Sequence, residues 1–274
     1  QLFLASSLAV AMADVDVGVA LNWGDGLPRG SIVVLEDTVE ADGSVFIHHV
    51  IRSALQAHEE QAVLLVACDQ RKEHYEAVSR KMGNYVRRAQ QKGMFLFIDG
   101  MAGGDTWSTS EPCGLEALPT ASLKRLFATI EEQTESSPTG LCIVIDCIAQ
   151  LLAWSAQPLD VLKLIRNLCS LVKNSPHTLV FLMHAVEDEE IEEEAELQEV
   201  GAAAVTAELR HFASLHIHCG PLITGYSKDI HGKLSITQRA GSCTTKAHGK
   251  PLPDLLHYKV TEVGVKVFVP GSSR

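Results

Sequence analysis

The sequence lacks the features that mark several common classes of protein. No apolar run reaches the ~18 residues that a membrane-spanning helix needs. The seven cysteines include no C-x-x-C pair and fall mostly inside apolar runs, which predicts reduced core thiols in a cytoplasmic or nuclear protein rather than disulfides or a zinc site. Acidic residues outnumber basic ones, 34 against 23, and no Lys/Arg block is present, so a broad basic surface for nucleic acid is not expected.

Most of the net charge of -11 comes from one short segment. The stretch E-D-E-E-I-E-E-E-A-E (187–196) is acidic at eight positions, and the rest of the chain is close to neutral. We predict that residues 186–200 form a solvated acidic surface loop. A docking site for a basic partner is the alternative function of this segment.

Short apolar, β-branched runs alternate with segments of helical period along the first two thirds of the chain. This alternation predicts an α/β fold with a mainly parallel central sheet and helices on both of its faces. The runs contain few polar residues, as expected for strands that are covered on both sides. The predicted strands are 31–36, 62–68, 94–99, 141–146 and 178–184.

After residue 210 the pattern changes to period-two segments with turn residues between them. Residues 222–239 are predicted to form a hairpin that turns near Asp229–Gly232, and residues 256–269 a second hairpin. Both would add antiparallel strands at one edge of the sheet. We expect one domain over residues 15–270. Residues 1–14 begin with an apolar stretch that imitates a signal peptide but has no basic start, and they are otherwise read as an N-terminal helix or an appended segment. Segments rich in Gly, Ser, Thr or Pro predict loops at 100–119, 134–140 and 240–254.

The loop E-D-T-V-E-A-D-G-S (36–44) lies between a strand and a helix, where many α/β proteins bind nucleotide phosphates. A phosphate-binding loop G-x-x-x-x-G-K-S/T needs two glycines, a lysine and a hydroxyl. With Ser44 as the hydroxyl, Asp37 and Asp42 replace the glycines and Gly43 replaces the lysine. A frame shifted by one residue recovers Gly43 as a glycine but puts Ser44 at the lysine position.

Electrostatics therefore oppose a triphosphate at this degenerate loop. Two unit charges ~4 Å apart repel by about 4 kcal/mol at an effective dielectric constant of 20, whereas the dipole of the following helix offers only ~0.3–2 kcal/mol. We expect no bound nucleotide and no other cofactor. In the structural interpretation, Ser44 is the N-cap of the helix and Asp42 a partner of its dipole.

The strand L-C-I-V-I-D (141–146) ends in an aspartate, as a Walker B strand does, where the acid normally holds Mg²⁺. The alternative is that Asp146 caps the next helix. The two half-motifs in this order indicate a RecA-like core that has lost its catalytic loop, without catalytic residues. His216 and His218 share a strand face but have no third ligand at a diagnostic distance, so no metal site is predicted.

Three stretches together resemble a known family. They are V-V-L-E-D-T-V-E-A-D-G-S-V-F-I-H-H-V-I (33–51), the strand ending at Asp146, and T-G-Y-S-K-D-I-H-G-K-L-S-I (224–236). The chain is similar, from about residue 15 to residue 270, to the sixth-subunit family of the Elongator complex, whose members share the D-G-S/A-x-x-x-H-H and T-G-x-x-x-D-V/I-H-G patterns. The first dozen residues and the acidic segment depart from it.

The resemblance implies a RecA-like three-layer fold without working nucleotide motifs. It further implies a place beside the fourth and fifth Elongator subunits in a hetero-hexameric ring, which docks onto the catalytic core and binds tRNA for wobble-uridine (U34) modification. Arg210 and Arg239 are candidates for roles in trans or for RNA contact, and otherwise surface arginines; Lys228 and Lys233 are further basic candidates for RNA. A cytoplasmic and nuclear location is expected.

Two rival functions come from other classes of protein. A catalytically active RecA/Rad51-type ATPase would use an atypical phosphate loop together with Asp146. A Rossmann-like enzyme would need a G-x-G-x-x-G turn, which the first strand-to-helix loop lacks.

Overall fold

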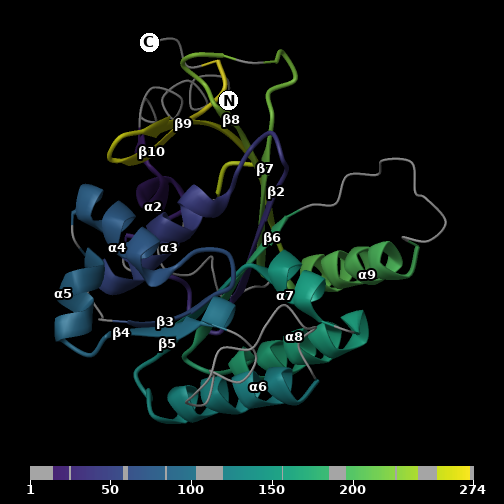
Figure 1. Ribbon diagram of the computed structural model, residues 1–274. Helices are drawn as coiled ribbons and strands as arrows, with labels where there is room; N and C mark the ends of the chain where they lie inside the picture. Colours follow the sequence, from purple (N-terminus) through teal and green to yellow (C-terminus); the bar gives the residue numbers. More distant parts are fainter. Residues whose placement is uncertain are drawn as a thin grey trace.

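The computed structural model describes residues 15–24, 26–57, 61–83, 85–102, 120–155, 157–184, 196–225, 227–239 and 252–271. In these ranges one ten-stranded sheet runs through the molecule, in the order β1-β10-β9-β8-β7-β2-β6-β5-β3-β4. Helices cover both of its faces (Figure 1). The three-layer α/β architecture predicted from the sequence is confirmed.

Six neighbouring strands form the parallel part of the sheet. Five of them follow the predicted apolar runs to within one residue at each end. β2 and β5 are buried along their whole length, as expected for strands that helices cover on both faces. In sheet order they are β7 (Leu215–Gly220), β2 (Ile32–Asp37), β6 (Thr178–His184), β5 (Leu141–Asp146), β3 (Ala62–Ala67) and β4 (Phe95–Asp99).

Alternate residues of each strand enter one of two hydrophobic cores. In β2, Val33 and Leu35 face the first core, and Ile32 and Val34 face the second. The first core is covered by α2 (Val17–Ala20), α3 (Ser44–Gln56), α4 (Lys72–Lys81) and α5 (Tyr85–Gln91). The second is covered by α6 (Thr120–Glu135), α7 (Ile148–Trp154), α8 (Pro158–Val172) and α9 (Glu196–Phe212).

Antiparallel strands extend one edge of the sheet, as predicted. β8 (Gly232–Gln238) pairs with β7, then β9 (Leu255–Thr261), β10 (Gly264–Phe268) and β1 (Val15–Asp16) follow. The β9–β10 hairpin confirms the prediction for residues 256–269.

The predicted hairpin at 222–239 is wrong in its first arm. The partner of β8 is β7, in register from Leu215–Gln238 to Gly220–Lys233. The described residues between Gly220 and Gly232 contain no strand, and Gly232 is the first residue of β8 rather than part of a turn. The inward apolar positions of β7 alternate with histidines, and this period-two pattern defines the true first arm.

Two predicted loops are shorter than expected. α9 begins at Glu196, so residues 196–200 are helical, while 186–195 lie outside the described residues. α6 extends to Glu135, which leaves 136–140 as the loop. At 100–119, a 3-10 turn η1 (Gly100–Ala102) is described, and 103–119, 240–251 and 1–14 lie outside the described residues.

The described cysteines are free and buried, and their burial is as predicted for core thiols: Cys68, Cys142, Cys147, Cys169 and Cys219. Burial raises the pKa of the Cys142 and Cys169 thiols to about 12, so both are uncharged core side chains at neutral pH. Within the described ranges, no helix combines the length and apolar character needed to cross a membrane.

Candidate functional site

The candidate site lies where the parallel strands end. In open α/β sheets, ligands bind at the carboxyl ends of the strands. Here β2 ends in Glu36 and Asp37, β6 ends in His184, and β5 ends in Asp146. The register pairs Asp37 with His184, so acidic and basic side chains that are far apart in the sequence meet at this edge.

Carboxylates of the chain itself occupy the N-terminus of α3. Asp37 Oδ2 accepts a hydrogen bond from the Gly43 N–H at 2.6 Å, and Asp42 Oδ1 accepts one from the Ser44 N–H at 2.8 Å. These are the first amides of the helix, the groups that bind phosphate in a working loop. Asp37 is buried, so its carboxylate is a fixed part of the site.

The N-cap of α3 is Gly43, and Ser44 is the first helical residue. The prediction of Ser44 as N-cap is therefore wrong by one position. The side chain of Asp37 explains the glycine: a Cβ on Gly43 would lie 2.9 Å from Asp37 Cβ and 3.1 Å from Asp37 Oδ2. The side-chain oxygens that cap the helix belong to Asp37 and Asp42, in place of the Ser44 hydroxyl that was expected.

Asp37 also holds a histidine that the sequence analysis did not single out. Asp37 Oδ1 lies 2.6 Å from His184 Nδ1. This hydrogen bond raises the pKa of His184 well above its ordinary value, so the imidazole carries a positive charge at neutral pH. The only sequence signal was a polar residue that ends the apolar run 178–184. The pair places a cation near the degenerate loop, but that cation is already neutralised by Asp37.

Asp146 does not cap the following helix. The N-cap of α7 is Cys147, without a side-chain hydrogen bond, so the capping prediction is wrong. Instead, Asp146 Oδ2 accepts a hydrogen bond from the Tyr75 hydroxyl of α4. Asp146 Oδ1 is buried and has no hydrogen-bond partner within the described part of the chain. Burial raises the pKa of Asp146 to about 6, against the opposing effect of the Tyr75 hydrogen bond.

A second buried acid, Glu36, is surrounded by three basic side chains. Arg210 Nε lies 2.8 Å from Glu36 Oε2, and its Nη2 contacts Oε1. His216 Nε2 is 2.8 Å from Oε2, and His218 Nδ1 is 3.9 Å from Oε1. Burial alone would raise the pKa of Glu36, but the hydrogen bonds from His216 and Arg210 outweigh it and lower the pKa to about 2. Glu36 is therefore an anion that anchors α9 to the sheet.

The four basic candidates do not form one cluster. Arg210 pairs with Glu36, and Arg239 donates to the carbonyl oxygen of His211 at the end of α9. Lys233 lies at the opposite end of β8, beside Gly220. Lys228 is exposed in the segment between β7 and β8.

The described residues contain no group of three or more His, Cys, Asp or Glu side chains placed to hold a metal ion. His216 and His218 share a strand face as predicted, and both face Glu36. Glu36 and Asp37 are each paired with basic side chains of the chain itself.

Solved structures with the same architecture show that the chain has a RecA-like α/β fold. The flagellar accessory protein FlaH of Methanocaldococcus jannaschii matches with a TM-score of 0.60, over 94% of this chain and 99% of that protein, at 17% identity. A KaiC-like protein of Pyrococcus horikoshii matches with a TM-score of 0.57, over 89% and 92%, at 13% identity. At such identities the likeness establishes the fold alone.

The sequence narrows the class to a family. The family model described as Elongation complex protein 6 matches residues 19–262, and the chain belongs to that family. Similar curated proteins, each named Elongator complex protein 6, include those of Rattus norvegicus (28% identity over 266 residues) and Homo sapiens (27% over 265). Both alignments cover 91% of this chain and 94% of the relative. The resemblance predicted from the three motifs is confirmed.

Proposed function

We propose that this chain is a non-catalytic, RecA-like subunit of the Elongator complex. It assembles with the fourth and fifth Elongator subunits into a hetero-hexameric ring, which docks onto the catalytic core and supports tRNA binding and wobble-uridine (U34) modification. The observation that carries the non-catalytic part is the hydrogen bond from the Gly43 N–H to Asp37, because it fills the phosphate position with a carboxylate.

A nucleotide would have to displace several interactions to enter this site. The N–H groups of Gly43 and Ser44 are bonded to Asp37 and Asp42, and Asp37 is paired with His184. A phosphate would lose these bonds or face the carboxylates, at about 4 kcal/mol per charge pair at ~4 Å. No lysine is present in the loop to offset that repulsion.

In a ring, such a subunit still contributes through its surfaces. RecA-like rings bind nucleotide between neighbouring subunits, so a subunit without a working loop shapes an interface or supplies groups in trans. Arg210 contacts a neighbouring subunit only when it releases Glu36. Arg239 does so only when it releases the carbonyl oxygen of His211. Exposed Lys228 and half-buried Lys233 of the β7–β8 region are the basic side chains that we assign to RNA phosphate, with affinity that falls as salt rises.

One observation favours the second candidate, a RecA/Rad51-type ATPase with an atypical loop. Asp146 lies at the Walker B position, with one oxygen lacking a partner among the described residues. Titration of the chain with Mg-ATP in a calorimeter separates the two functions. We expect no saturable binding; micromolar binding that Asp146→Asn abolishes would favour the ATPase.

Co-purification tests the assembly. A tagged chain expressed in its own cells is expected to leave the column with two stoichiometric partners of similar fold, and the three-protein ring to retard tRNA in a native gel more than this chain alone. Fractionation of the same cells tests the expected cytoplasmic and nuclear location. A chain that purifies alone under these conditions contradicts the ring.

A further inference from the structure

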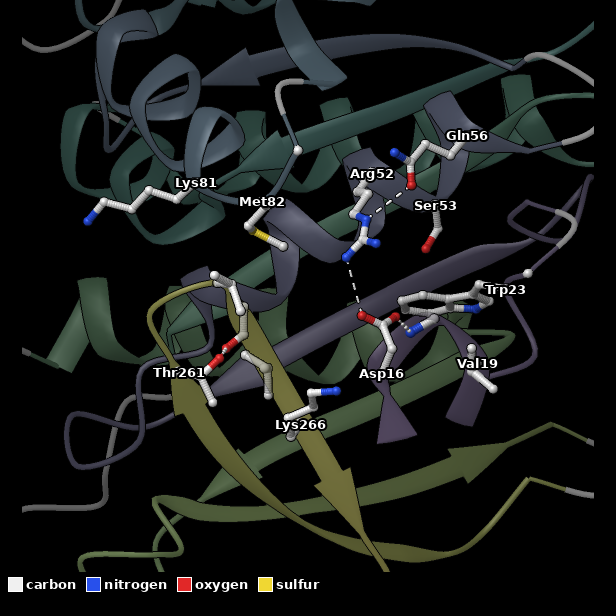
Figure 2. A pocket seen from close by; sticks show the side chains of 16 residues that line it. Asp16, Val19, Trp23, Arg52, Ser53, Gln56, Lys81, Met82, Thr261 and Lys266 are labelled. Carbon is white, nitrogen blue, oxygen red and sulfur yellow. Dashed lines mark hydrogen bonds and ion pairs between the residues drawn. The ribbon is translucent and has the colours of Figure 1, made fainter. Parts of the chain in front are cut away.

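A cavity of about 630 Å³ lies apart from the carboxyl ends of the parallel strands, and Figure 2 shows the side chains that line it. Its walls come from α2, the second half of α3, the end of α4, and the β9–β10 hairpin. Gly43 lies at the N-terminus of α3, whereas Arg52, Ser53 and Gln56 line the cavity from the last turns of that helix. The cavity is therefore a separate feature from the phosphate position, and its use does not depend on the proposed function.

Positive charge prevails in this cavity, although the whole chain is acidic. Among the described residues, Arg52, Lys81 and Lys266 line it together with one carboxylate, Asp16. No partner of the Lys81 or Lys266 ammonium group is found in the described ranges. The buried imidazole of His49 adds no charge at neutral pH, because burial lowers its pKa to about 4. The cavity thus favours an anionic ligand.

The arginine is held in a defined position before any ligand arrives. Arg52 Nη1 lies 3.3 Å from Asp16 Oδ2, and Arg52 Nε donates to Gln56 Oε1 at 3.0 Å (Figure 2). Asp16 is itself fixed by the Gly18 N–H at 2.9 Å. A guanidinium fixed in this way binds a carboxylate at a smaller cost in side-chain entropy.

A buried tryptophan forms part of the cavity wall. Trp23 lines the cavity and is only 1% exposed. Its Nε1 is buried and has no hydrogen-bond partner within the part of the chain that the structure describes. Because this atom has almost no exposed surface, it lies behind the cavity wall and offers no contact to a ligand in the cavity.

The same cavity has apolar side chains on its rim. Val19 of α2 is 61% exposed, and Val263 in the β9–β10 turn is 62% exposed. A ligand with an apolar side chain would remove the exposed surface of these two valines from water, which is favourable. A phosphodiester backbone has no apolar side chain to bury against Val19 and Val263.

We infer that this cavity is a docking groove for an acidic protein segment that carries an apolar side chain among its carboxylates. The carboxylates pair with Lys81, Lys266 and Arg52, and the apolar side chain packs against Val19 and Val263. The complementary charges and the apolar rim together define this class of partner.

A labelled peptide tests the groove. The probe is V-E-D-E-E-I-E-E-E-A-E-L, the sequence of residues 186–197, because it surrounds an isoleucine with acids. Fluorescence anisotropy with the full chain is expected to show saturable binding that weakens with salt. Lys81→Glu/Lys266→Glu is expected to weaken it on the order of tenfold or more, since two attractive charges become repulsive.

The matched control reverses two exposed lysines on helices of the opposite face, Lys124 of α6 and Lys173 at the end of α8. Lys124→Glu/Lys173→Glu makes the same change in total charge and is expected to weaken binding by no more than about twofold. Circular dichroism melts of both variants check that they fold.

Peptide variants separate the two kinds of contact. Replacing the acids with glutamine is expected to abolish binding, and replacing the isoleucine with serine to weaken it several-fold. An equal loss of peptide affinity in the groove variant and the control variant would overturn the docking site. A failure of every acidic peptide to bind would overturn it as well. Binding of an RNA oligonucleotide that the groove variant abolishes, without peptide binding, would assign the groove to nucleic acid instead.

Discussion

The carboxylate of Asp37 accepts a hydrogen bond from the backbone N–H of Gly43 at 2.6 Å, across the loop that a nucleotide would need. The other oxygen of Asp37 contacts His184. One side chain therefore joins the end of β2, the start of α3 and the end of β6. The carboxylate that occupies the phosphate position of the loop is also a structural support of the sheet edge.

Asp37→Asn is predicted to destabilise the fold. The amide keeps the shape but removes the charge that holds His184 and caps α3, and a hydrogen bond to a charged group contributes about 1.5–3 kcal/mol. We expect the free energy of unfolding to fall by about 2 kcal/mol at pH 6. Urea denaturation measures it, and the NMR titration of His184 should show its pKa returning toward about 6.5.

The sign of the pH dependence follows from His184. Its folded pKa is raised by Asp37, so the stabilisation is fully present below the unfolded pKa of about 6.5 and declines as pH rises toward the folded pKa. The difference in the free energy of unfolding between the parent protein and Asp37→Asn should therefore become smaller between pH 6 and pH 9. A gap of constant size across this range would contradict a charged pair.

The sequence alone predicted the parallel strands and showed that the loop 36–44 has no lysine. It did not predict the contacts between distant side chains. Strands such as 141–146 can be recognised in the sequence because burial on both faces requires an apolar run. The Tyr75–Asp146 hydrogen bond joins residues 71 positions apart, and Arg210 meets Glu36 across 174. Such pairs depend on how helices pack against the sheet, which local patterns do not record.

Glu36→Gln is predicted to lower stability and to remove an acid-sensitive transition. The pKa of Glu36 is lowered to about 2, so its contribution is present above the unfolded value of about 4.5 and is lost as pH falls toward 2. The parent protein should lose stability across this window more steeply than the variant. Denaturation curves at pH 7, 4 and 3 measure the difference, and parallel profiles would contradict the assignment.

Arg210→Ala separates a role within the chain from a role in a neighbouring subunit. The Arg210 side chain is 53% exposed, so solvent screening keeps its coupling to Glu36 modest, at about 1 kcal/mol. A double-mutant cycle with Glu36→Gln measures this coupling in the isolated chain. Normal ring assembly and tRNA retardation by Arg210→Ala would limit the residue to its internal pair, whereas a loss of tRNA retardation by a stable ring would establish a role in trans.

Asp146→Asn is predicted to stabilise the fold at neutral pH. Burial raises the pKa of Asp146 to about 6, so its ionisation costs stability as pH rises from the unfolded value of about 3.8 to 6. The neutral amide should gain roughly 2–3 kcal/mol above pH 6 and little at pH 4. Urea denaturation at both values measures the gain. A loss of stability at pH 7.5 would instead show that the charged carboxylate is needed.

Gly232→Ala is predicted to destabilise the β7–β8–β9 edge. Gly232 is the second glycine of the T-G-x-x-x-D-I-H-G motif, and it packs closely against β7 and β9. A Cβ there would lie 2.7 Å from the ring of Tyr258 and 2.8 Å from the carbonyl oxygen of Gly220. Overpacking of this kind costs about 1–3 kcal/mol. Gly24→Ala is the control, since its Cβ would meet no atom within 4 Å. Thermal unfolding should separate the two variants by several degrees; equal melting temperatures would mean that Tyr258 moves aside without cost.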